Sequence, residues 1–203
     1  MITVAALYVD PRGPYPSMPG VECWDETRDA RNYAGPHPVV AHPPCGPWGA
    51  LAQMRVPNRE RRTQDIGCAE PAVAAVRLWG GVLEQPARSA MFRAFGMPSP
   101  FGGVDYCGGW TFHCSQVHWG HPAEKQSWVY VVGFARFLPM PPFPGRRPTH
   151  WVSGGRKLDR KGSGGVVPAG IKVCSSGQRR RTPPAFAEFL VDLARQCRKT
   201  ESP

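Results

Sequence analysis

The chain has 203 residues, of which 41% are hydrophobic and 20% charged, which is enough for one domain with a real core. It contains no run of 18 apolar residues, and its first residues resemble a β-strand rather than a secretory leader. The 23 glycines and 24 prolines predict many turns and few long helices. Its 7 cysteines have irregular spacings that indicate no disulfide framework, so we expect reduced thiols in a cytoplasmic protein.

The positive charge is concentrated at one end of the chain. The formal net charge is +10, but residues 1–144 carry 12 Lys and Arg against 11 Asp and Glu. Residues 145–203 carry 13 Lys and Arg against 4 Asp and Glu. A basic segment on a nearly neutral body favours a polyanionic partner, most simply nucleic acid. A solubilising tail is the alternative.

Two kinds of periodicity predict the secondary structure. Short apolar and β-branched runs predict strands over residues 2–9, 21–24, 38–41, 82–86, 110–114 and 128–132. Helical spacing predicts helices over residues 27–33, 59–79, 89–95 and 182–194, the last with Thr182 as its cap and Pro183 at its first position. Residues 149–181 predict loops with one hairpin. This order favours an α/β fold with a mostly parallel, Rossmann-like sheet.

One thiol stands at the end of a predicted strand. Pro43 and Pro44 must end the strand over residues 38–41, because proline fixes φ and cannot donate to a sheet. Cys45 follows them directly, on a rigid turn. A cysteine in this position is a candidate nucleophile. The alternative is a small buried residue with no chemical role.

Acidic residues end two further predicted strands. Asp25 follows the strand over residues 21–24, and Glu84 lies in the strand over residues 82–86. Functional residues of parallel α/β sheets lie beyond the carboxyl ends of the strands. One α/β unit separates Cys45 from Glu84, so we expect both side chains to face the same crevice.

A thiolate and a carboxylic acid together can activate a pyrimidine ring. The thiolate adds to C6, and the acid donates a proton or a hydrogen bond to N3. Negative charge then develops at C5, which becomes a nucleophile for a one-carbon unit. The sequence therefore predicts a pyrimidine-C5 transferase with Cys45 as nucleophile and Glu84 as the N3 acid.

Several short motifs occur in the order found in cytosine-C5 DNA methyltransferases. Residues 43–45 match the Pro-Cys nucleophile motif of that family, and residues 83–86 resemble its Glu-Asn-Val or Glu-Asn-Pro motif. Asp25 stands 20 residues before Cys45, where the family has the Asp that binds the cofactor adenine. The chain thus resembles a compact member of the family, of the kind often found in phages.

A further motif extends the resemblance to about residue 133. Residues 119–129 resemble the family's Tyr-Gly-x-Pro-Gln-x-Arg-x-Arg strand motif, with Lys125 and Ser127 at the two Arg positions. Lysine supplies positive charge near the base but not the bidentate fork of arginine. The resemblance therefore implies that Lys125 is an auxiliary cation of the catalytic site.

The donor site departs from the family pattern. The family's Phe-x-Gly-x-Gly turn is absent, and the segment between residues 10 and 25 is too short for the usual first helix and second strand. We expect a shortened site for S-adenosylmethionine, or for methylenetetrahydrofolate, which thymidylate synthases use in comparable chemistry. The expected donor-site residues are Asp25, Asp10 and Trp24.

Basic and aromatic residues are candidates for DNA contacts. Trp48 could stack on a base or belong to the core. The arginines expected to hold phosphates, with a solvated helix start as the alternative for the first three, are Arg59, Arg61, Arg62, Arg179, Arg180 and Arg181.

A second cluster is a candidate zinc site. It consists of Cys107, Cys114, His118 and His121, whose spacing is not that of a usual zinc finger. The alternatives are histidines that border the base or donor pocket, together with Gln116, or surface histidines beside a buried thiol. We assign no metal ligand.

We therefore expect three regions: a catalytic α/β domain over residues 1–144, a basic loop-rich region over 145–181, and a C-terminal helix over 182–203 that packs back on the core. The expected protein is a monomer that modifies DNA in the cytoplasm, away from membranes. The alternative is a catalytically inactive, methyltransferase-like protein that binds nucleic acid.

Overall fold

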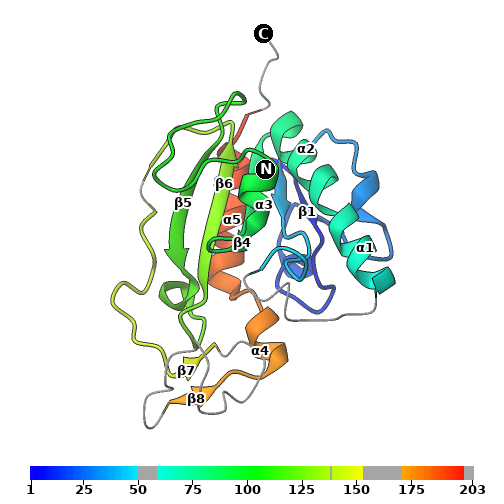
Figure 1. Ribbon diagram of the computed structural model, residues 1–203. Helices are drawn as coiled ribbons and strands as arrows, with labels where there is room; N and C mark the ends of the chain where they lie inside the picture. The colour runs from blue at the N-terminus through cyan, green and yellow to red at the C-terminus, as the bar shows by residue number, and fades with distance from the viewer. Residues whose placement is uncertain (50–58, 138, 153–170, 199–203) are drawn as a thin grey trace.

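A six-stranded sheet forms the centre of the molecule, with helices on both faces (Figure 1). The computed structural model describes residues 1–49, 59–137, 139–152 and 171–198, with the backbone alone for residues 59–62. The strand order is β2-β1-β3-β4-β6-β5. The strands are β1 (Val4–Leu7), β2 (Val21–Trp24), β3 (Val39–Ala41), β4 (Gly81–Pro86), β5 (Trp110–Ser115) and β6 (Gln126–Val132).

The sheet is mostly parallel, which confirms the expected α/β class. β1 pairs in parallel with β2 and β3, and β3 pairs in parallel with β4. Only β6 is reversed, because it pairs antiparallel with both β4 and β5. The carboxyl ends of the other five strands and the beginning of β6 therefore meet at one edge of the sheet.

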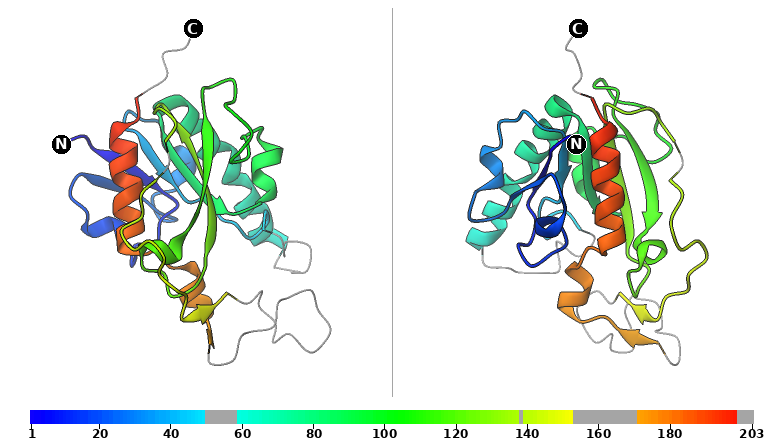
Figure 2. Two further views of the ribbon diagram at one scale, coloured as in Figure 1. Left: turned by 90° about the vertical axis from the view of Figure 1, so that its left-hand side faces the viewer. Right: turned by 180° about the vertical axis from the view of Figure 1, so that it is seen from behind.

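Each face of the sheet has its own core. The helix α5 (Pro184–Gln196) covers one face, and α2 (Ala69–Trp79) and α3 (Ala90–Ala94) lie on the other (Figure 2). Alternate strand residues divide between the two: Val40 and Val82 face α5, whereas Ala41 and Leu83 face α2. No helix in the described part of the chain is long and apolar enough to cross a membrane.

Most predicted elements occur, with three corrections. The helix expected over residues 27–33 is only a short 3-10 turn, η2 (Ala30–Asn32), because Asp29 has a left-handed φ of 51° that ends any helix there. The long helix over residues 59–79 is two, α1 (Arg59–Gly67) and α2, which meet at Cys68. The last helix has Pro183 rather than Thr182 at its N-cap position, without a side-chain capping hydrogen bond, and Pro184 at its first position.

The basic region also differs from the expected hairpin. Its two short strands, β7 (His150–Trp151) and β8 (Lys172–Val173), pair in parallel. They are followed by a short helix, α4 (Ser176–Arg180), which begins with a capping box between Ser175 and Gln178. Two further 3-10 turns, η1 (Tyr15–Ser17) and η3 (Gln116–Trp119), border the carboxyl edge of the sheet.

Gly81 allows the close approach of β3 and β4. Its φ is 125°, and a Cβ atom at this position would overlap the backbone of Val39. β3 leads to the loop that holds Cys45, and β4 itself contains Glu84, so this glycine sets the spacing on which the candidate site depends.

We predict that Gly81→Ala lowers the free energy of unfolding by about 3 kcal/mol, because backbone strain and overpacking both act there. Urea denaturation measures the loss. Gly67→Ala is the matched control, since nothing lies within 4 Å of its added Cβ. Equal stabilities for the two variants would contradict this account of the strand spacing.

Candidate active site

Cys45 and Glu84 lie at the carboxyl ends of the neighbouring strands β3 and β4. The peptide N–H groups of Trp48 and Gly49 donate to the Cys45 carbonyl at 3.1 and 2.9 Å, which makes the tight turn that presents the thiol. Cys45 is an exposed residue. The sheet therefore brings together the two residues that the sequence paired.

Opposing charges act on the Cys45 thiol. Packing around the sulfur raises its pKa by desolvation, and the nearby charge of Glu84 raises it further. The charges of Lys125 and Arg180 lower it. The net shift of the Cys45 pKa is upward, so the group is a protonated thiol at neutral pH, and its reaction requires removal of a proton.

Glu84 is a buried carboxylate with three hydrogen-bond donors. It is 7% exposed. Its Oε1 accepts from Gln116 Nε2 at 3.1 Å and from the Ser127 hydroxyl, and its Oε2 pairs with His42 Nδ1 at 3.2 Å. Gln116 and Ser127 also bond to each other at 2.9 Å, so one oxygen is held by a closed triangle of polar groups.

These partners keep Glu84 ionised. Burial alone raises the pKa of a carboxyl group, but the hydrogen bond from His42 and the charge of Lys125 outweigh it and lower the pKa of Glu84 to about 2. A carboxylate accepts hydrogen bonds and cannot donate one. Glu84 can therefore serve as the expected acid only by first taking up a proton.

Tyr15 fixes the orientation of His42. The Tyr15 hydroxyl is 2.6 Å from His42 Nε2, and Tyr15 is buried on the α5 face. Burial raises the pKa of Tyr15 well above its ordinary value, so it remains a neutral donor. With Tyr15 donating to Nε2, a neutral His42 carries its proton on Nδ1, facing Glu84.

Gln85 braces the nucleophile loop. Its amide nitrogen donates to the Pro43 carbonyl at 2.5 Å, and its Oε1 accepts from the Ser89 hydroxyl at 3.2 Å. The Ala90 N–H donates to the Trp48 carbonyl at 2.9 Å. The residue after Glu84 thus ties the Cys45 loop to β4 and α3 from within the protein.

Lys125 links this site to the basic helix α4, which carries Arg179 and Arg180 and is followed by Arg181. Lys125 lies just before β6, and its Nζ donates to the Arg181 carbonyl at 3.3 Å, at the end of α4. Its charge acts on both Cys45 and Glu84. The lysine therefore joins the end of α4 to the start of β6, close enough to Cys45 and Glu84 for its charge to act on both.

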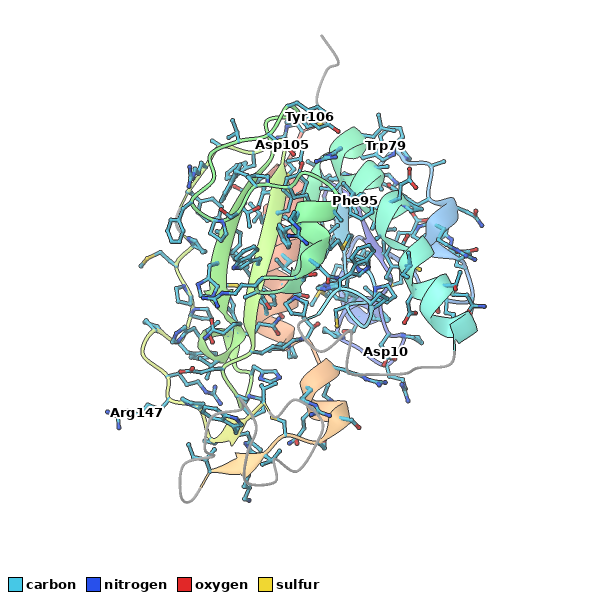
Figure 3. The ribbon with its side chains drawn as sticks, viewed as in Figure 1. Asp10, Trp79, Phe95, Asp105, Tyr106 and Arg147 are labelled. Atoms are coloured by element: carbon cyan, nitrogen blue, oxygen red, sulfur yellow. The ribbon has the colours of Figure 1, made fainter. Side chains whose placement is uncertain are left out.

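The expected donor-site residues are engaged in local interactions. Asp10 pairs with Arg12 at 3.0 Å and lies at the end of the molecule that holds α4 (Figure 3). Asp25 Oδ1 accepts from the N–H groups of Thr27 and Arg28, both at 2.9 Å. The Arg28 guanidinium covers the Trp24 ring at 3.7 Å.

The fit of these residues to a donor is only partial. Buried polar atoms without a partner in the described residues are present nearby, at the Tyr8 hydroxyl and the Trp24 indole nitrogen. Trp24, however, is covered by Arg28, and Asp10 is neutralised by Arg12. The three expected residues do not form a ready cradle for a one-carbon donor.

The candidate DNA-contacting residues fall into three groups. The Trp48 indole packs edge-on against Phe95 at 5.8 Å, in the position of a core residue. The side chains of Arg59, Arg61 and Arg62 lie outside the described atoms. The remaining three arginines, Arg179, Arg180 and Arg181, lie at the end of α4 beside Lys125.

The candidate zinc residues are not gathered into a ligand set. Among the residues whose positions are described, no three His, Cys, Asp or Glu side chains form a group that could hold a metal ion. His121 Nε2 donates to the Gln178 carbonyl at 3.1 Å, and its Nδ1 accepts from the Ala123 N–H at 3.0 Å. His118 Nδ1 is 3.3 Å from the Phe143 carbonyl.

Sequence reasoning missed Tyr15 and His42 in this site. A usable signal existed for His42, which lies in the same proline-bounded run as Cys45, so it had to reach the same strand end. Tyr15 gave no such signal, because η1 brings it to His42 across the sheet. No protein-family model, curated protein or solved structure matches the chain, so the site stands on its own geometry.

The depressed pKa of Glu84 gives a pH signature. A carboxyl group whose pKa is lower in the folded state stabilises the protein above its unfolded pKa, near 4.3, and loses that contribution as the pH falls toward about 2. We predict that the stability difference between wild type and Glu84→Gln shrinks by on the order of 2–3 kcal/mol between about pH 6 and pH 2.5.

Urea denaturation at a series of pH values measures this difference. Glu70→Gln, exposed on α2, controls for the loss of one negative charge. A Glu84→Gln difference that is independent of pH would show that the carboxylate network does not exist in solution.

Proposed function

We propose that the protein is a pyrimidine-C5 one-carbon transferase that acts on DNA, with Cys45 as the nucleophile at C6 and Glu84 as the group that serves N3. The observation that carries this proposal is the placement of the thiol and the carboxylate at adjacent strand ends, close enough for the charge of Glu84 to raise the pKa of Cys45. Their order and surroundings match the two roles that the chemistry requires.

The resting protonation states make a coupled proton transfer necessary. At rest, Cys45 is a thiol and Glu84 a carboxylate. When the thiol loses its proton to Glu84, Glu84 can pass that proton to ring N3 while the thiolate forms the S–C6 bond. The C5–C6 double bond supplies the electron pair that moves to C5, and the proton count is unchanged. The loss of charge on Glu84 also removes one cause of the raised thiol pKa.

The neighbouring residues position these two groups. His42, held by Tyr15, and Gln116 with Ser127 fix the two carboxylate oxygens, and Gln85 fixes the Cys45 loop. Lys125 and Arg180 supply positive charge that favours the thiolate and would attract the DNA backbone. A bound donor would supply an electrophilic carbon for C5, and both S-adenosylmethionine and methylenetetrahydrofolate remain candidates.

An exchange reaction tests the proposal without a donor. Once the thiolate has added to C6, C5 can take a deuteron from heavy water, and loss of the original proton followed by release of the thiolate restores the base. We predict that wild type exchanges the C5 hydrogen of cytosine or uracil in DNA, as measured by mass spectrometry of the nucleosides.

Variants assign the two roles. Cys45→Ser should reduce exchange to background, whereas Cys68→Ser, a half-buried thiol between α1 and α2, should keep it. Glu84→Gln should lower the rate by about 10²–10⁴ because proton transfer to N3 is lost. Exchange that persists in Cys45→Ser would contradict the mechanism. Adding each donor in turn to wild type then shows which one yields a C5-modified base.

A protein that binds nucleic acid without transfer is the second candidate. The raised pKa of Cys45 favours it, because a resting nucleophile usually has a lowered pKa. This alternative predicts DNA binding by wild type and by Cys45→Ser with no exchange in either.

The basic helix should contribute to DNA affinity under both candidates. We predict that changing Arg179, Arg180 and Arg181 together to Gln weakens DNA binding. The slope of log affinity against log salt concentration should become less negative by about 2–3. Fluorescence anisotropy at several salt concentrations measures this slope. The control is a variant in which Arg31, Arg93 and Arg136 are changed together to Gln. It removes the same charge from the α/β domain, away from α4. Equal slopes for the two triple variants would show that α4 makes no phosphate contacts.

A further inference from the structure

A cavity of about 450 Å³ lies between η3 and the junction of α4 with α5. None of the roles proposed above uses it. The residues that define its character are Trp119, His121, Pro122, Arg181, Pro183 and Ala185. Its volume falls in the range of small-molecule sites and is ample for a single nucleotide.

The inner wall of this cavity is apolar and rigid. Trp119 is 3% exposed and packs against Phe186 at 5.3 Å, so its position is fixed by the core under α5. Pro122 and Pro184 add flat apolar surface with little freedom to move, and Ala185 also lines the cavity. Trp119 supports this surface from the core, so a planar ring would lie on the prolines and Ala185 rather than on the indole.

His121 does not supply charge to the cavity. Both ring nitrogens are engaged by backbone groups, at Ala123 and Gln178. Burial lowers the pKa of His121, so it is neutral at pH 7. The polar recognition in the cavity therefore comes from other residues.

Cations stand at the rim. Arg181 lines the cavity and is exposed. Arg146, which lies over the Phe143 ring at 5.7 Å, comes within 3.9 Å of where a Cβ would stand on Gly120, another lining residue. An apolar wall with a cationic rim matches a nucleotide, which has a planar base and an anionic phosphate.

The cavity is next to the proposed catalytic site. The carbonyl of Arg181 accepts from Lys125, and the charge of Lys125 reaches both Cys45 and Glu84. His121, which lines the cavity, donates its backbone N–H to the Gln116 carbonyl at 3.0 Å, and the Gln116 side chain in turn donates to Glu84. The cavity therefore adjoins the partners of the carboxylate at the same edge of the sheet.

We propose that this cavity binds the nucleotide adjacent to the target pyrimidine in the same DNA strand, with its base against the wall of Pro122, Pro184 and Ala185 and its phosphate at Arg181. This inference rests on the proposed function for the identity of the neighbouring site. The binding itself needs no chemistry, so it can be tested separately.

Single-stranded oligonucleotides with one central pyrimidine provide the test. Fluorescence anisotropy should show that removal of one neighbouring base, by an abasic residue, weakens wild-type binding about tenfold. Ala185→Trp fills the cavity and should abolish the difference between intact and abasic strands. Glu188→Trp, exposed on the same helix, should preserve it.

A second pair of variants covers the case in which Ala185→Trp does not fold. Arg181→Gln should weaken binding of a strand that carries a phosphate at the neighbouring position more than binding of one with a neutral methylphosphonate there. Arg93→Gln, exposed on α3, should affect the two strands equally. Circular dichroism establishes which variants are folded.

The outcomes separate the two proposals. An abasic penalty that Ala185→Trp removes, without any C5 exchange, supports the nucleotide pocket and rejects the transferase. C5 exchange that depends on Cys45, with no abasic penalty at either neighbour, supports the transferase and overturns the pocket. Equal binding of intact and abasic strands by wild type also overturns it.

Discussion

A buried carboxylate at the end of β4 is the constraint on which the rest of the structure depends. An unpaired negative charge in such a place would cost several kcal/mol, so Glu84 requires donors from several directions. They come from three parts of the chain: His42 after β3, Gln116 after β5, and Ser127 in β6. Any fold that satisfies Glu84 must bring these strand ends together at one edge, and this also determines where Cys45 lies.

The loop that holds Cys45 is fixed by a buried side chain, Gln85, on the protein side of the loop. Gln85 points to the opposite face of β4 from Glu84 and holds the Pro43 carbonyl, so consecutive residues of one strand serve the carboxylate network and the Cys45 loop separately. This division matters chemically, because a loop held only by side chains on its exposed side would move whenever a substrate displaced them.

The elements with a local signal were predictable, and those made by long-range contacts were not. Pro43 and Pro44 end β3, and the alternating apolar residues of β4 lead to Glu84, so the paired strand ends follow from the sequence. The helix predicted over residues 27–33 does not form because Asp29 has a left-handed backbone conformation. The spacing of apolar side chains, on which the prediction relied, does not reveal such a conformation. The role of Tyr15 could not be predicted because its partner, His42, is 27 residues away in the sequence. The motif resemblance to the methyltransferases remains a hypothesis about function.

The reversed direction of β6 divides the site between two independent parts of the chain. In a parallel strand the residues that follow it reach the carboxyl edge, but β6 brings the residues that precede it, including Lys125. The thiol is carried by the loop after β3, whereas Lys125 and one wall of the cavity, from Trp119 to Pro122, come from the segment between β5 and β6. Residues around α4 and α5 form the other wall. Insertions or substitutions in that second segment can alter what lies beside the thiol while leaving its own strand untouched.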